Sequence, residues 1–158
     1  LIKQRANLAY IITEVIKNQN LSILSRKIKI DLNCPKLILE CDKQKISTII
    51  DNLLSNAVKF SPEASCIKIH AKQFDHIIWL DIIDSGIGVD IADEDKIFEP
   101  FYQGRTAPIS KIRGTGLGLS IAREYAYAHG GNIELIQHPD EPGAHFRLTL
   151  PVVDLEER

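Results

Sequence analysis

Three stretches of the chain place apolar residues three and four positions apart, which is the spacing of an amphipathic helix. They cover residues 8–16, 43–58 and 117–129. The middle stretch follows Asp42, a favoured N-cap residue, and stops at Ser61-Pro62, because the residue before a proline is pushed out of the helical region. The pattern therefore predicts three helices, each with one buried face.

Six shorter runs alternate apolar and polar residues or are rich in branched apolar residues, which is typical of β-strands. They are residues 28–32, 37–41, 66–74, 77–83, 133–136 and 145–150. Turn residues separate the first run from the second at 33–35 and the third from the fourth at 75–76, so we expect two hairpins. The last two runs flank a turn that contains Pro and Gly.

Between residues 84 and 118 the periodicity fails, and Gly, Pro, Asp and Ser accumulate. A stretch of roughly 30 residues without regular structure is unusual in a compact domain unless it serves as a functional lid. We expect a short helix at 92–98 and a mobile lid over 90–113, with Phe98 and Phe101 packed as anchors at its base.

The composition narrows the class of protein. The 158 residues are 44% hydrophobic, which excludes disorder, and the net charge of -2 argues against a nucleic-acid-binding surface. No apolar run reaches the roughly 18 residues that cross a bilayer, and we see no signal peptide. The three cysteines lack a C-x-x-C spacing, so we expect reduced, mostly buried thiols rather than a metal site. Methionine is absent, and we interpret the sequence as a piece of a longer protein.

The first candidate chemistry lies on the middle helix. At about 100° per residue, Asn52, Asn56 and Lys59 share one polar stripe of this helix. Such a stripe is usually a solvated face, but two amides and an ammonium without an intervening acid also suit a metal-bound polyphosphate. Directly after a buried strand comes Asp84-Ser85-Gly86-Ile87-Gly88. This segment is either a common Asp-Gly turn or a carboxylate that accepts from an exocyclic amine, beside glycines that allow close approach.

A glycine-rich segment, Gly114-Thr115-Gly116-Leu117-Gly118-Leu119-Ser120, opens the last predicted helix. Such a segment favours an anion, because unpaired N–H groups and the helix dipole point outward at a helix N-terminus. Its spacing matches neither the P-loop nor the Rossmann fingerprint. The aromatic run Ile97-Phe98-Glu99-Pro100-Phe101-Tyr102 is equally consistent with local loop packing and with a lid.

In this order, the segments DNLLSNAVKFSP, DSGIGV, IFEPFYQG and GTGLGLSIAR resemble the N, G1, F and G2 boxes of the catalytic, ATP-binding domain of bacterial sensor histidine kinases. The resemblance covers residues 8–150. It implies an α/β two-layer sandwich with an ATP lid (a Bergerat-type fold), in which a mixed sheet of about five strands packs against three helices.

The resemblance also implies that the domain binds ATP and Mg²⁺ and transfers the γ-phosphoryl group to a histidine. Asn56 resembles the amide ligand of the metal, with Asn52 beside it on the metal or the phosphates. Lys59 resembles a phosphate contact. Asn56 and Lys59 are thus the expected catalytic residues.

The base and the phosphates have further implied contacts. Phe60 resembles the aromatic neighbour of the adenine, and Asp84 resembles the acceptor for its amino group. Gly86 and Gly88 shape the floor of that pocket. The implied lid residues are the cations Arg105 and Arg113, together with Gly114, Thr115, Gly116, Leu117, Gly118 and Leu119 around the phosphates. The motif does not assign the γ-phosphate to either cation.

The phosphoacceptor histidine of the family lies in a separate helical domain, and none of the five histidines here has its setting. We expect residues 1–16 to be a linker and first helix from that upstream dimerisation domain, 8–152 to be the catalytic domain, and 153–158 to be a tail. The implied partners are the upstream domain, in a homodimeric parent, and a response regulator, without nucleic acid or membrane contact. The implied location is the cytoplasm, and an inner-membrane anchor of the parent is left open.

Alternatives within the same fold stay open. The ATP-hydrolysing relatives (gyrase, mismatch-repair and chaperone ATPases) use a Glu one helical turn before the metal-binding Asn to activate water. Here that position is Asn52, which cannot take a proton. A binding-only module is disfavoured because the motif positions are intact, whereas an anti-sigma-type serine kinase is not distinguished by this domain alone.

Overall fold

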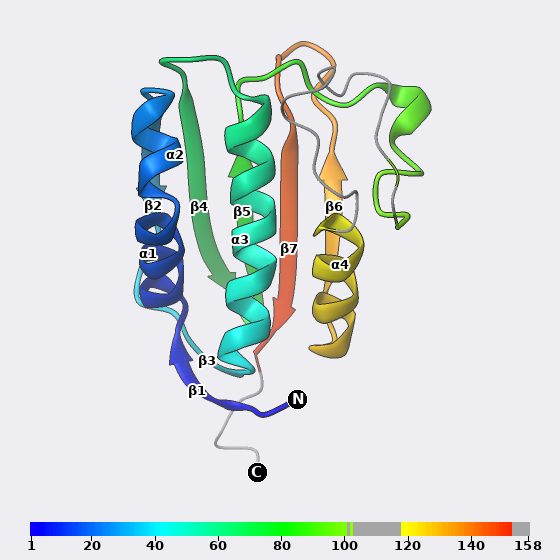
Figure 1. Ribbon diagram of the computed structural model, residues 1–158. Helices are drawn as coiled ribbons and strands as arrows, with labels where there is room; N and C mark the ends of the chain where they lie inside the picture. The colour runs from blue at the N-terminus through cyan, green and yellow to red at the C-terminus, as the bar shows by residue number, and fades with distance from the viewer. Residues whose placement is uncertain (101, 103–117, 153–158) are drawn as a thin grey trace.

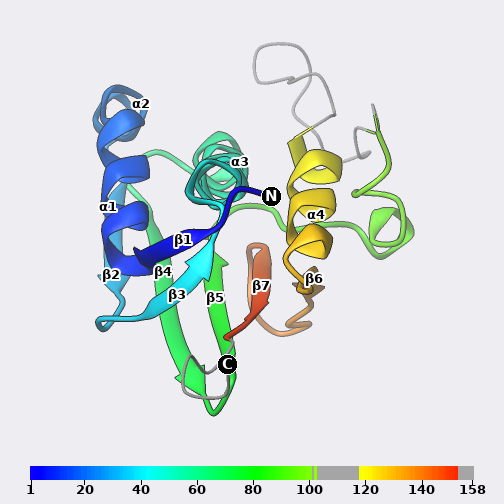
Figure 2. The same cartoon turned by 90° about the horizontal axis from the view of Figure 1, so that it is seen from below.

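The computed structural model describes residues 1–100, 102 and 118–152 (Figure 1). A five-stranded mixed sheet is covered on one face by helices α1 (Leu8–Asn18), α3 (Lys43–Phe60) and α4 (Gly118–Ala128). No described element packs on the other face, which Figure 2 shows from the end of the sheet and which we call the uncovered face. The structure therefore confirms the predicted two-layer α/β sandwich.

The strand order of this sheet is β2-β4-β5-β7-β6. Its strands are β2 (Lys29–Asn33), β4 (Cys66–Phe74), β5 (Ile77–Ile83), β6 (Asn132–Ile136) and β7 (His145–Pro151). β4 and β5 form the expected antiparallel hairpin, and β6 and β7 form another. β2 alone in this sheet pairs in parallel, with β4.

The predicted hairpin between residues 28–32 and 37–41 is wrong. β3 (Ile38–Cys41) instead pairs antiparallel with β1 (Gln4–Asn7) in a separate two-stranded sheet. Ile30 of β2 lies opposite the fully buried Ile67 and packs against the main core, and this burial decides the partner of β2. The sequence analysis missed β1, with its polar sequence QRAN, and the six-residue helix α2 (Asn20–Ser25).

The central helix α3 follows its sequence signals closely. The side chain of Asp42 accepts the backbone N–H of Lys45, and the helix ends before Ser61. Its apolar stripe is buried between α1, α4 and the sheet: Ile46, Ile49, Ile50, Leu53, Leu54, Ala57 and Val58. At the end of α4, Gly130 has φ +78° and provides the expected C-terminal stop.

Two smaller expectations need correction. The helix expected at 92–98 is a single 3₁₀ turn at Ile91–Asp93, followed by irregular turns. The three cysteines are free thiols, as expected, but Cys41 alone is fully buried, while Cys34 and Cys66 are half-buried.

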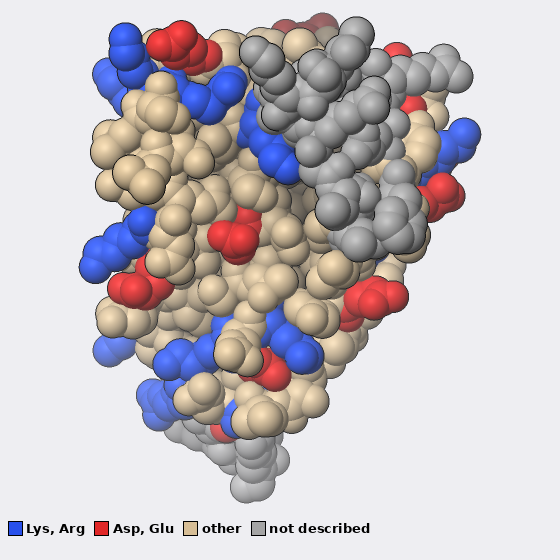
Figure 3. Space-filling model, in the orientation of Figure 1, with Lys and Arg blue, Asp and Glu red and all other residues tan. Residues whose placement is uncertain are grey.

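On the helix-covered face, Lys and Arg are scattered among Asp, Glu and uncharged residues (Figure 3). None of the described helices is long and apolar enough to cross a membrane.

Candidate functional site

Three of the four motifs meet at one end of the sandwich. A β-carbon added at Gly86, after β5, would lie 2.2 Å from the carbonyl oxygen of Phe60, the last residue of α3. One added at Gly118, the first residue of α4, would lie 3.1 Å from Oδ1 of Asn52. Glycine at these two positions thus lets the β5 end, the polar stripe of α3 and the start of α4 approach closely.

Asp84 is held in a fixed orientation at the centre of this region. The side chain is buried, and its Oδ1 accepts the backbone N–H of Gly86 at 2.8 Å and of Ala144 at 3.0 Å. Burial, opposed by these two hydrogen bonds, raises the pKa of the Asp84 carboxyl above its ordinary value. Oδ2 accepts no hydrogen bond from another described residue, so one carboxylate oxygen is left to accept from a ligand.

The loop between β6 and β7 contributes residues that the sequence analysis missed. Gly143 has φ +101°, and a β-carbon there would lie 2.0 Å from the carbonyl oxygen of Asp84. The backbone N–H of Asp84 also donates to the carbonyl of Ala144 at 3.0 Å. Gly88, with φ +78°, lies against Gly143 from the other side. The Pro142-Gly143 turn signalled a reversal of the chain, but no local pattern signalled its contact with Asp84.

The polar stripe of α3 presents the predicted amides and ammonium beside α4. Asn52, Asn56, Lys59 and Phe60 are half-buried, and the Asn56 and Lys59 side chains form no hydrogen bond or ion pair with another described residue. The described residues contain no cluster of three His, Cys, Asp or Glu that could hold a metal. A metal at this site would therefore use amide oxygens and the phosphates of a ligand, a donor set that suits Mg²⁺.

The start of α4 and the aromatic segment around Phe98 border the candidate site on the side away from Asp84. Leu119 is half-buried and packs against the core, and the ring of Phe98 packs edge-on against Phe146 with centroids 6.2 Å apart. The guanidinium of Arg123 covers the Phe98 ring at 4.2 Å, so Phe98 packs against the core as expected. The remaining lid predictions fall outside the described residues: Phe101, Arg105, Arg113, Gly114, Thr115, Gly116 and Leu117.

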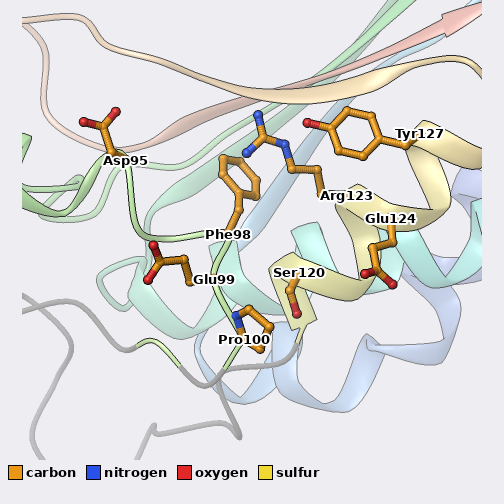
Figure 4. Close-up of a pocket in the computed structure, with 8 residues that line it drawn as sticks. All are labelled: Asp95, Phe98, Glu99, Pro100, Ser120, Arg123, Glu124 and Tyr127. Atoms are coloured by element: carbon orange, nitrogen blue, oxygen red, sulfur yellow. The ribbon is translucent and has the colours of Figure 1, made fainter.

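A separate pocket of about 250 Å³ lies between the segment around Phe98 and the outer side of α4 (Figure 4). Three acidic residues, Asp95, Glu99 and Glu124, line it together with Arg123. Acidic side chains repel phosphate, so this pocket suits a polyphosphate less well than the polar stripe of α3, which carries amides and an ammonium.

Comparisons with known proteins show what this chain is similar to. The sequence model of the family described as "Histidine kinase-, DNA gyrase B-, and HSP90-like ATPase" matches residues 41–154. The sensor histidine kinase WalK of Bacillus subtilis is 37% identical over 123 residues, which are 77% of this chain and 20% of WalK. The alginate biosynthesis sensor protein KinB of Pseudomonas aeruginosa is 37% identical over 115 residues, which are 72% of this chain and 18% of KinB.

Solved structures show the same fold. The catalytic domain of the histidine kinase ThkA superposes with a TM-score of 0.83 at 27% identity, covering 98% of this chain and all of that domain. A mycobacterial sensor histidine kinase, MprB, superposes with a TM-score of 0.86 at 23% identity, covering 96% of this chain and all of that chain. The chain spans about a fifth of the length of the two curated relatives, WalK and KinB.

Proposed function

This chain belongs to the family of histidine kinase-, DNA gyrase B- and HSP90-like ATPases, and from that membership we propose that it binds Mg-ATP and presents the γ-phosphoryl group to a histidine on another domain. The family and the fold predicted from the four motifs are confirmed. The observation that carries the proposal is the meeting of Asp84, the carboxylate-free stripe of α3 and the start of α4 at one end of the sandwich.

In this proposal the base and the phosphates occupy different parts of the site. Oδ2 of Asp84 accepts the adenine amino group, because Oδ1 is already held by two backbone N–H groups. The amide oxygens of Asn56 and Asn52 would hold Mg²⁺, and Lys59 would contact the phosphates. The metal would supply positive charge that offsets the negative charge of the phosphates.

The residues of the site favour transfer to a histidine over transfer to water. Phosphoryl transfer depends mainly on positioning and charge stabilisation, so amides, a lysine and backbone N–H groups suffice. Water needs a positioned base, and Asn52 cannot accept its proton. A neutral imidazole already carries a lone pair. The names of the relatives, which are sensor histidine kinases, support the same choice.

Radiolabelled ATP tests this proposal, first with the chain alone and then with the phosphoacceptor domain of the parent protein added. We expect slow hydrolysis and no label on the chain alone, and an acid-labile, base-stable label on the added domain. The variant Asn52→Glu should hydrolyse ATP faster than the wild type, because it supplies the missing base. Rapid turnover by the wild-type chain alone would favour an ATPase, and an acid-stable label on a partner would favour a serine kinase. The response regulator, the homodimeric parent and the cytoplasmic location remain predictions.

A further inference from the structure

Two histidines and an aspartate form a chain of contacts on the uncovered face of the sheet. His145, at the start of β7, is 6% exposed, and its Nε2 lies 2.9 Å from Oδ1 of Asp81 on β5. Its Nδ1 lies 2.9 Å from Nε2 of His138, an exposed residue in the loop between β6 and β7. The ring planes are within 10°, and the centroids are 5.2 Å apart. This separation exceeds the N···N distance by about one ring diameter, so the rings meet end to end in a hydrogen bond.

The surroundings decide which nitrogens carry protons. A lone pair on Nε2 of His145 would face the carboxylate of Asp81, so this nitrogen carries a proton. This contact is a close electrostatic contact and not an aligned hydrogen bond, since Nε2 of His145 has no hydrogen-bond partner among the described residues, and the same Asp81 oxygen accepts Nε of Arg147 at 2.8 Å. Burial raises the pKa of Asp81, but its contacts with His145 and Arg147 outweigh burial and lower it, so the carboxyl is ionised.

The direction of the hydrogen bond between the two histidines follows from this assignment of protons. Nδ1 of His145 is the acceptor, and Nε2 of His138 must donate to it. A metal bound about 2.0 Å from each nitrogen would need the two nitrogens to lie farther apart and the two rings to meet at an angle. The contact therefore fits a shared proton and not a metal. The hydrogen bond thus runs from His138 to His145, and the proton on Nε2 of His145 faces the carboxylate of Asp81.

The contacts among His138, His145 and Asp81 are directly connected to the proposed base site. His145 follows Ala144, whose N–H holds Oδ1 of Asp84, and His138 lies in the same loop on the other side of Gly143. We propose that His138 and His145 are positioning residues, which hold the β6–β7 loop so that Ala144 keeps Oδ2 of Asp84 turned toward the nucleotide base. The inference rests on the proposed role of Asp84 in nucleotide binding.

The test compares His138→Ala with His138→Gln, whose side-chain amide can still donate to His145. The matched control is His70→Ala, because His70 contacts Asp31 at 3.2 Å on the same face without touching the loop. Calorimetry with ADP is run on each protein at neutral pH. Hydrogen exchange of the Ala144 amide is measured by NMR without nucleotide.

We expect His138→Ala to weaken ADP binding about two- to tenfold near neutral pH, the factor of one net hydrogen bond. The backbone amide of Ala144 should exchange faster in His138→Ala, while His138→Gln and His70→Ala stay near wild type. Unchanged ADP affinity or unchanged Ala144 exchange in His138→Ala would overturn this inference alone. A wild-type chain that binds no ADP would overturn the proposed function as well.

Discussion

Replacing Asp84 by Asn probes the proposed base site with little structural change. In the native site, Oδ1 of Asp84 accepts the N–H groups of Gly86 and Ala144 at 2.8 and 3.0 Å. The amide oxygen of Asn can accept both, which leaves its NH₂ group in the place of Oδ2. A donor then faces the adenine amino group, which is itself a donor.

The size of the effect follows from this mismatch. Leaving a buried hydrogen-bonding group unsatisfied costs about 1–3 kcal/mol, which weakens ADP binding by about 5- to 150-fold. Guanine carries an acceptor oxygen where adenine carries the amine, and the new NH₂ group can donate to it. The preference for ADP over GDP should therefore fall in Asp84→Asn, beyond the loss of ADP affinity itself.

The substitution should leave the domain folded. Because burial raises the pKa of the Asp84 carboxyl, its ionised form makes the native state less stable as pH rises from the ordinary aspartate pKa through the raised one. A neutral Asn lacks this cost. We expect the free energy of unfolding of Asp84→Asn at neutral pH to be no lower than that of the wild type.

Titration calorimetry with ADP and GDP, together with urea unfolding, measures both effects. Asp31→Asn is the matched control, because Asp31 lies exposed on β2 and its side chain contacts His70. An ADP affinity equal to that of the wild type, with an unchanged preference over GDP, would refute the role of Asp84. If the affinities for ADP and GDP fell by the same factor, the defect would lie outside the contact with the base.

Three further predictions concern other parts of the domain. Gly143→Ala should lower the free energy of unfolding in urea by more than Gly130→Ala does. Both glycines have positive φ, which costs an alanine about 1–2 kcal/mol, but only the β-carbon at residue 143 would also clash with backbone, 2.0 Å from the carbonyl oxygen of Asp84. Asn56→Ala should weaken ADP binding more with Mg²⁺ than without it, because the amide is the proposed metal ligand; an equal loss in both titrations would exclude that role. Iodoacetamide at mildly alkaline pH should label Cys66 before Cys41 by mass spectrometry, because Cys41 is fully buried and burial raises its pKa to about 11; equal rates would contradict this.

Local signals were enough to predict most of the elements and the four motifs. Asp42 caps α3, Ser61-Pro62 ends it and Gly130 stops α4, because capping and turn preferences act over a few residues. Periodicity identified which face of each helix is buried, since burial repeats with the helical turn. The order and spacing of the motifs were then enough to predict the family, because the candidate site residues are clustered in short segments.

Only the tertiary structure decided which distant segments meet. β2 pairs in parallel with β4 instead of turning back onto β3, because the main core buries its apolar side next to Ile67. Asp84 is held by Ala144, sixty residues further along the chain, through a backbone N–H that no side-chain pattern reveals. The contact between His138 and His145 likewise depends on the β6–β7 hairpin closing over the sheet end. Sequence patterns record local preferences and burial, whereas the partner of a strand or a backbone donor is set by packing of the whole domain.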